Sequence, residues 1–192
     1  LAKLIKRSGI IFNRLPDEDF DYDIVGDYTG AGVIFGATGG VLEAALRTAA
    51  DVLEGVDHDN IEYKEIRGTK GFKEAVYKVA GMDVKVAVVS GLNNANELLK
   101  KIESGEADYH IVEVMCCPGG CVNGGGQPIH DGEERADVLG NKLYTIDSNR
   151  PLHQSHNNPD VQELYKDFLE KPLSEKAEQL LHSDHVKEHN YM

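Results

Sequence analysis

Three cysteines lie within six positions of this 192-residue chain, at Cys116, Cys117 and Cys121. Thiolates are soft ligands that suit iron–sulfur clusters, zinc or copper(I). The C-x3-C spacing of Cys117 and Cys121 predicts that both sulfurs face the same way on a turn of helix. Thiols this close together cannot form a long-range disulfide framework, and the chain shows no export signal. We therefore expect metal or redox chemistry in a reducing compartment, the cytoplasm.

Glycines surround the cysteine pair, because the segment from Met115 to Pro128 reads MCCPGGCVNGGGQP. Glycine allows positive φ and lets the backbone approach a bulky inorganic cofactor without a Cβ in the way. Glycine N–H groups can also donate to anionic ligands. A C-x3-C pair alone fits two buried structural thiols as well as it fits a metal site. The glycines favour the metal site, since a flexible loop without a ligand would carry a large entropic cost.

The segments around this loop predict an α/β fold: a small, mainly parallel sheet flanked by helices, with a helical segment at the C-terminal end. Apolar residues recur at helical spacing over 41–53, and Gly55 follows where a helix cap belongs. Residues 61–66 alternate as a strand would. Two further strands, 72–79 and 84–89, are predicted to form a hairpin.

A βαβ unit is predicted next, because a helix over 95–103 lies between the strands 84–89 and 109–115. Asn93 or Asn94 is expected to cap this helix, and Leu98, Leu99 and Ile102 are expected on its inner face. The cysteine loop then begins where the last strand ends. In open α/β sheets, sites lie beyond the carboxyl ends of the strands.

Residues 133–149 and 159–181 show charged helical patterns, interrupted by prolines. We therefore divide the chain into a main lobe, 1–150, and a C-terminal helical segment, 151–192, that packs on it. The formal net charge of -13 disfavours binding to nucleic acid or to anionic lipid. No apolar run approaches the roughly 20 residues that span a bilayer. The acidic run over 17–27 is interpreted as solvated surface.

The segment MCCPGGCVNGGGQP resembles the third and last signature of the FeFe, or iron-only, hydrogenases. Residues 30–47 resemble the active-site glycine segment of that family, and residues 105–115 resemble the strand that enters the signature. The tail, 152–182, is similar to the closing helices. The resemblance covers nearly the whole chain. It implies the C-terminal half of the H-cluster domain of an enzyme that reversibly reduces protons to hydrogen.

The resemblance also implies roles for five residues. Cys117 would bind the 4Fe-4S cubane of the H-cluster. Cys121 would bind the cubane and also bridge to the di-iron subcluster. Met115 would lie close to the di-iron centre, and Phe35 and Gly36 would line its pocket.

The first two signatures of the family, which read like TSCCP and MPC-x2-K-x2-E, are absent. A cubane needs four ligands, usually cysteine thiolates, and Cys116 is interpreted as a non-ligand. We therefore expect a fragment, a processed chain or a split subunit that is inactive alone. Its expected partners are the N-terminal part of the domain and an electron-transfer protein, such as ferredoxin or an NAD(P)-reducing subunit.

Two other functions stay open: a non-catalytic relative that works in cytosolic iron–sulfur assembly, and a hydrogenase-derived sensor. Met115 and the tail beyond Leu152 favour the enzyme. The spacing H-x2-H-x3-H also occurs near the C-terminus, in His182, His185 and His189. It could bind metal, but a frayed polar tail is the favoured interpretation. Glu43 and Arg47, four residues apart, are expected to pair on a helix.

Overall fold

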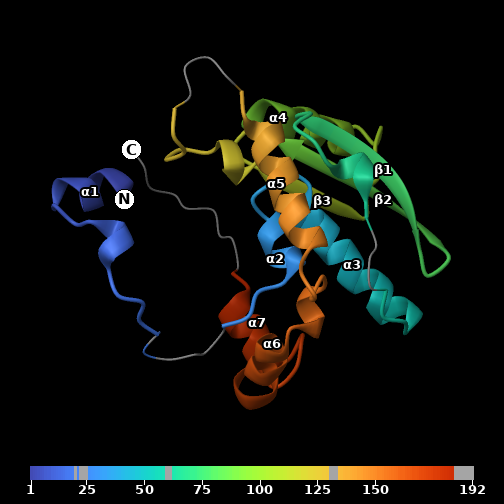
Figure 1. The fold of residues 1–192 in the computed structure, drawn as a ribbon. Helices are drawn as coiled ribbons and strands as arrows, with labels where there is room; N and C mark the ends of the chain where they lie inside the picture. Colours follow the sequence, from blue (N-terminus) through green and yellow to red (C-terminus); the bar gives the residue numbers. More distant parts are fainter. Residues whose placement is uncertain (20, 22–25, 59–61, 130–133, 184–192) are drawn as a thin grey trace, which may run out of the picture.

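The computed structural model describes residues 1–19, 21, 26–58, 62–129 and 134–183 (Figure 1). Its centre is a sheet of three strands, β1 (Phe72–Val79), β2 (Met82–Ser90) and β3 (Ile111–Met115), in the order β1–β2–β3. β1 and β2 form the expected antiparallel hairpin, and β2 and β3 are parallel, joined through helix α4 (Leu92–Glu103). The α/β class is confirmed. The sheet is mixed in the described residues, which corrects the expectation of a mainly parallel one.

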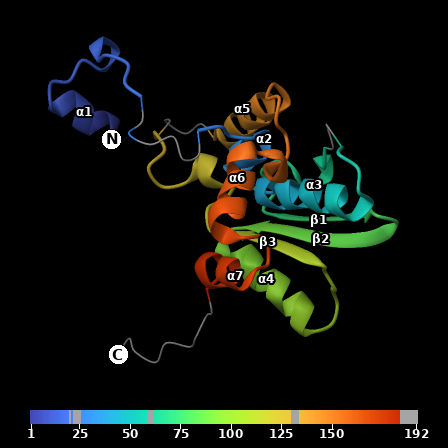
Figure 2. The same ribbon diagram turned by 90° about the horizontal axis from the view of Figure 1, so that it is seen from below.

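Helices cover both faces of this sheet (Figure 2). Side chains alternate along a strand, so β2 contributes to a core on each face. Val86 and Val88 pack with residues of helix α3 (Gly40–Glu54), while Ala87 and Val89 pack with Leu98 of α4. The near-continuous apolar run of β2 is therefore buried on both sides, as expected for a central strand.

Helix α3 ends as the sequence predicts, at Gly55 in the left-handed conformation (φ 65°). Its apolar residues are divided between two environments. Leu42 and Leu46 are buried against the sheet, whereas Val41 and Val52 are exposed. The apolar stripe over 41–53 therefore belongs to the core only in part. The helix buries a charged face instead, made of Glu43, Arg47 and Asp51.

The strand expected over 61–66 is not formed in the described residues. The described part of 61–66 is a 3-10 turn, Lys64–Ile66, and not a strand. Tyr63 and Ile66, three residues apart, both enter the core with α3, which a turn allows and an alternating strand does not. Residues 59–61 lie outside the described part of the chain.

Helix α4 begins earlier than expected, with Gly91 (φ 84°) at its N-cap. The side chain of Asn94 donates to the carbonyl oxygen of Ser90 instead of capping the helix. Only Leu98 of the three expected inward residues is buried, and Leu99 and Ile102 are exposed.

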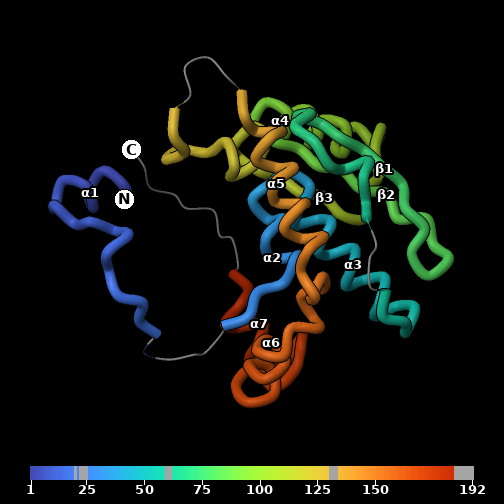
Figure 3. The backbone as a smooth tube through the Cα atoms, in the orientation of Figure 1, coloured from blue at the N-terminus to red at the C-terminus, as the bar shows by residue number. Residues whose placement is uncertain are grey.

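The remaining helices are α1 (Ala2–Arg7), α2 (Gly30–Ile34), α5 (Ala136–Ser148), α6 (Pro159–Leu164), a π turn (Tyr165–Leu169) and α7 (Glu175–Leu181). The tube in Figure 3 places α2 and α5 beside each other, next to the cysteine loop. Within the described residues, no helix is long and apolar enough to cross a membrane. Two members of the histidine motif, His185 and His189, lie outside the described residues.

Candidate functional site

The cysteine loop leaves the carboxyl end of β3 and turns on glycine. Gly119 and Gly120 have positive φ (81° and 97°), and the N–H of Gly120 donates to the carbonyl of Cys117 over 3.0 Å. A single 3-10 turn follows, at Cys121–Asn123. The C-x3-C pair therefore surrounds a glycine turn, and the expected helical turn is wrong. All three cysteines are free; Cys117 is half-buried, and Cys116 and Cys121 are exposed.

This loop is bonded to the glycine segment that precedes α3. The backbone N–H of Val122 donates to the carbonyl of Gly36 (2.9 Å), and Thr38 donates to the carbonyl of Gly119 (3.2 Å). A Cβ on Gly120 would lie 2.6 Å from the nitrogen of Thr38, so only glycine permits this approach. The cysteine loop and the glycine segment therefore converge at one end of the sheet.

The ends of β2 and β3 are hydrogen-bonded to the cysteine loop and to each other. Ser90, the last residue of β2, accepts a hydrogen bond from the N–H of Gly119 through its hydroxyl oxygen (3.3 Å). The N–H of Gly91 donates to the carbonyl of Met115 over 2.8 Å. The loop thus lies where the topology of an open sheet places a site.

Two buried charged side chains hold the glycine segment. The carboxylate of Glu113, on β3, accepts hydrogen bonds from the N–H groups of Gly39 (2.6 Å) and Leu42 (2.8 Å), at the N-terminus of α3. A negative charge is favourable there because those N–H groups lack partners within the helix. Lys73 Nζ, on β1, donates to the carbonyls of Thr38 (2.9 Å) and Gly68 (2.7 Å). Burial lowers the pKa of Lys73 to about 8.

The sequence reasoning did not identify Glu113, Lys73 or Ser90 as part of this site. The sequence does contain an indication of Glu113, because this residue is the one charged residue in an otherwise apolar strand, IVEVM. A buried strand tolerates such a residue only when its charge has partners.

Gly36, Met115 and Phe35, which were predicted to lie at the di-iron pocket, differ in their exposure and in the hollow that they line. Gly36 lies between the cysteine loop and α5, where a Cβ would meet Val122 of the loop at 3.5 Å and Leu143 of α5 at 2.7 Å. Met115 is half-buried at the start of the loop. Phe35 is 45% exposed and lines an apolar hollow of about 490 Å³ along α3, together with Val41 and Val52.

A separate hollow of about 260 Å³ lies beside the cysteine loop. It is lined by Val122, Asn123, Gly124, Gln127, Pro128, Ile129, Arg135 and Leu139. A Cβ on Gly124 would lie 3.3 Å from the sulfur of Cys117. Because glycine has no Cβ, a narrow space beside the sulfur stays open. The donor set fits an iron–sulfur cluster in kind. It falls short in number, because the whole chain has three cysteines and a cubane takes four ligands.

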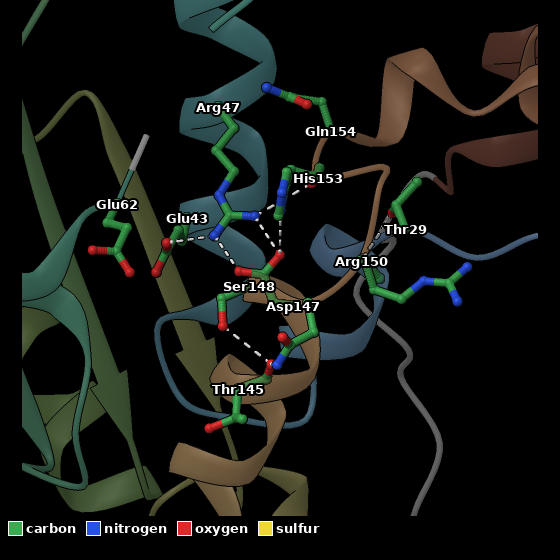
Figure 4. Close-up of polar contacts among 12 residues, drawn as sticks. Thr29, Glu43, Arg47, Glu62, Thr145, Asp147, Ser148, Arg150, His153 and Gln154 are labelled. Atoms are coloured by element: carbon green, nitrogen blue, oxygen red, sulfur yellow. Dashed lines mark hydrogen bonds and ion pairs between the residues drawn. The ribbon is translucent and has the colours of Figure 1, made fainter. Parts of the chain in front are cut away.

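Away from the cysteines, α3 is tied to α5 by a charge cluster, which we define as Glu43, Arg47, Arg67 and Asp147. Glu43, Arg47 and Asp147 are buried, and Figure 4 shows them together. The expected pair of Glu43 and Arg47 is confirmed at 2.8 Å. Arg47 also donates twice to the carboxylate of Asp147 (2.6 and 2.9 Å), and Arg67 donates to Glu43 (2.6 and 2.9 Å). Arg47 also donates to the carbonyl of His153 (3.3 Å), so it joins α3 to α5 and to the C-terminal segment.

Residues 1–125 match the family described as iron only hydrogenase large subunit, C-terminal domain, and residues 137–188 match iron hydrogenase small subunit. The NADP-reducing hydrogenase subunit HndD of Solidesulfovibrio fructosivorans is 50% identical over 97% of this chain and 32% of its own length. The cytosolic Fe-S cluster assembly factor narfl of Xenopus tropicalis is 40% identical over 78% of this chain and 31% of its own length.

Among solved structures, a variant of FeFe-hydrogenase HydA1 from Chlamydomonas reinhardtii superposes with a TM-score of 0.72 at 35% identity. The match covers 96% of this chain and 53% of that chain. The chain thus spans about a third of the curated relatives that it matches and about half of the solved one.

Proposed function

The chain belongs to the iron-only hydrogenase family, and we propose that it forms the C-terminal half of the catalytic domain of such an enzyme. In the complete domain, two protons and two electrons would be converted reversibly into hydrogen. The H-cluster, a 4Fe-4S cubane joined to a di-iron subcluster, would supply the redox chemistry when bound. The protein supplies ligands, positioning and exclusion of water.

The observation that carries this proposal is the junction of the cysteine loop with the glycine segment, through Val122 and Gly36. Cys117 and Cys121 would act as cluster ligands on opposite sides of the glycine turn. Gly36 would let the backbone come close to the cluster, and Met115 and Phe35 would help to keep water away from it. Glu113 and Lys73 would keep the glycine segment in place without touching the reacting atoms.

We propose that this chain is inactive alone, for two reasons. Its thiols are too few for a cubane, and it exposes apolar surface of the kind that marks an interface. One such surface is the hollow along α3. Another is an apolar hollow of about 660 Å³ that is lined by N-terminal residues, among them Leu1, Ile5, Ile11 and Phe12. The N-terminal part of the domain would cover these surfaces and add the missing cysteines.

The organisation and partners that we propose follow from this interpretation. Residues 1–150 would form the lobe and 151–192 the segment that packs on it, supported by the hydrogen bonds from Gly30 and Ala31 to the carbonyls of Leu152 and His153. Electrons would pass to a ferredoxin or to an NAD(P)-reducing subunit, because the relative HndD is named an NADP-reducing hydrogenase subunit. The proposed location is the cytoplasm, where three neighbouring thiols stay reduced.

The assignment is tested by Cys121→Ser in the complete protein, with Cys116→Ser as the matched control. The first variant should abolish hydrogen evolution and change the EPR spectrum of the cluster, because a ligand is lost. The second should retain both. Hydrogen evolution by the Cys121 variant at the wild-type rate would refute the ligand assignment.

Anaerobic reconstitution with iron and sulfide tests whether the chain is incomplete. The isolated chain should bind far fewer than four irons per molecule and evolve no hydrogen. Addition of the N-terminal part should raise the iron content and restore the visible absorbance of a cubane. A stable, stoichiometric cluster on the monomer would contradict the proposal.

A second candidate function is iron–sulfur assembly without hydrogen chemistry. The 40% identity to narfl favours keeping this candidate, although the hydrogenase subunit HndD is more similar over more of the chain. A complete protein that assembles its cluster and passes it to an apo-ferredoxin, but evolves no hydrogen with reduced ferredoxin or methyl viologen, would establish the second function.

A further inference from the structure

A second group of metal-binding side chains lies toward the other end of α3. One oxygen each of Asp51 and Asp57 and one nitrogen of His156 lie within 4.8 Å of one another. Asp51 follows Gly40, at the start of α3, by eleven residues, or roughly 16 Å of helix. The group is therefore separate from the cysteine loop, which contacts the N-terminal end of α3.

Asp51 is the buried member of this group, with 6% of its surface exposed. Its Oδ1 accepts a hydrogen bond from the backbone N–H of His58 (3.1 Å) and lies 2.8 Å from Nδ1 of the same residue. Its Oδ2 is buried and has no hydrogen bond. His156 Nε2 lies 3.2 Å from this oxygen, without the geometry of a hydrogen bond. A buried carboxylate oxygen without a hydrogen bond is costly, and a cation held between this oxygen and His156 Nε2 would satisfy it.

The other two side chains are held in place by further polar contacts. His156 Nδ1 lies 3.1 Å from the hydroxyl oxygen of Thr48, which leaves Nε2 directed at Asp51. Asp57 Oδ1 accepts a hydrogen bond from the side chain of Asn157 (3.0 Å). Supporting contacts of this kind orient the ligands of metal sites and fix the histidine tautomer.

We propose that Asp51, Asp57 and His156 bind a divalent cation of the first transition row, with Zn²⁺ as the reference ion. One imidazole and two carboxylates suit such ions and leave further positions for water. A charge of 2+ would also balance the two carboxylates. His58 acts as a positioning residue, because it holds the other oxygen of Asp51.

The proposed site would connect three segments: α3, the turn that follows it, and the 3-10 turn Ser155–Asn157. Both aspartates lie in the part of the chain that matches the large-subunit family, and His156 lies in the part that matches the small-subunit family. The cation would therefore fasten the C-terminal segment to the lobe.

The test is calorimetric titration of the 192-residue chain with Zn²⁺, after alkylation of its cysteines so that thiolates do not compete. One Zn²⁺ should bind per chain and raise the melting temperature. Asp57→Asn and His156→Gln should each weaken binding at least about 10-fold and remove most of the stabilisation by Zn²⁺. Asp57 is exposed, so its variant tests the site without loss of the fold.

Two further variants distinguish the site from its alternatives. Thr48→Val should weaken binding about 10-fold by releasing the histidine, and His182→Gln should bind Zn²⁺ as the wild type does. Loss of binding in the His182 variant would move the site to the tail. An alkylated wild type that binds no Zn²⁺ would show that the contacts of Asp51 with His58 and His156 are sufficient without a cation. Either result would overturn the proposal.

Discussion

Glu113 on β3 accepts a 2.6 Å hydrogen bond from the backbone N–H of Gly39, which lies 74 residues earlier in the chain. Through this bond and its partner at Leu42 (2.8 Å), a strand end fixes the N-terminus of α3 and the glycine segment before it. The same segment is hydrogen-bonded to the cysteine loop through Gly36 and Thr38. The geometry of the candidate site therefore depends on a side chain whose hydrogen bonds are made to the glycine segment and the start of α3.

Replacing Glu113 with Ala should lower the free energy of unfolding by about 2–4 kcal/mol, because two buried N–H donors lose a charged acceptor. Urea denaturation of the wild type and the variant measures this difference. Glu97→Gln, an exposed glutamate on α4, is the control and should change stability by less than about 0.5 kcal/mol. Equal losses in both variants would contradict a specific role for Glu113.

Lys73 should make stability depend on pH. Its pKa is lowered to about 8 in the folded chain and is ordinary in the unfolded chain, so between these values the unfolded state binds more protons. The contribution of Lys73 to the free energy of unfolding should therefore rise with pH from about pH 8 to pH 10.5, by at most about 3 kcal/mol.

Denaturation of the wild type and of Lys73→Met across this pH range checks the prediction, because other titrating groups cancel in the difference. Lys78→Met removes an exposed lysine whose side chain is 78% accessible. The difference in free energy of unfolding between this variant and the wild type should not change with pH. If the difference in free energy of unfolding between the wild type and Lys73→Met also does not change with pH, burial does not lower the pKa of Lys73.

The pair of Arg47 and Asp147 should be a strong link between α3 and α5. Asp147→Ala leaves a buried guanidinium without its bidentate partner (2.6 and 2.9 Å) and should cost about 3–5 kcal/mol. Lys78 and Asp83 form an exposed pair (2.9 Å), where Asp83→Ala should cost less than about 1 kcal/mol.

A double-mutant cycle separates the coupling of the two charges from the loss of packing. Arg47→Met combined with Asp147→Leu should be less destabilising than the sum of the single changes, because neither charge is then left buried alone. Additive effects would show that the two side chains are not coupled.

Gly120→Ala should disrupt the junction of the two loops. The added Cβ would meet the nitrogen of Thr38 at 2.6 Å in a backbone conformation (φ 97°) that alanine rarely adopts. We expect a loss of about 2–4 kcal/mol of stability and a lower iron content in the complete protein. Gly125→Ala is the matched control in the same loop, because its Cβ would meet nothing within 4 Å. A variant at Gly120 with wild-type stability and iron content would disprove the role of this contact.

The sequence by itself determined the local elements and the kind of chemistry. The hairpin of β1 and β2, the βαβ unit and the end of α3 at Gly55 follow from periodicity and residue type, which act over a few neighbouring positions. The thiols and glycines of one short segment were also sufficient to indicate a metal site. Helix starts and the strand expected at 61–66 were predicted less well, because burial against distant elements overrides local preference.

Only the tertiary structure decided which polar groups support the site. Glu113 meets Gly39 across 74 positions, Lys73 meets Thr38 across 35, and Arg47 meets Asp147 across 100. No local period links residues so far apart. Each of these charges is tolerated inside the protein only because the fold brings its partner to it, and that partner is chosen by the packing of the strands and helices.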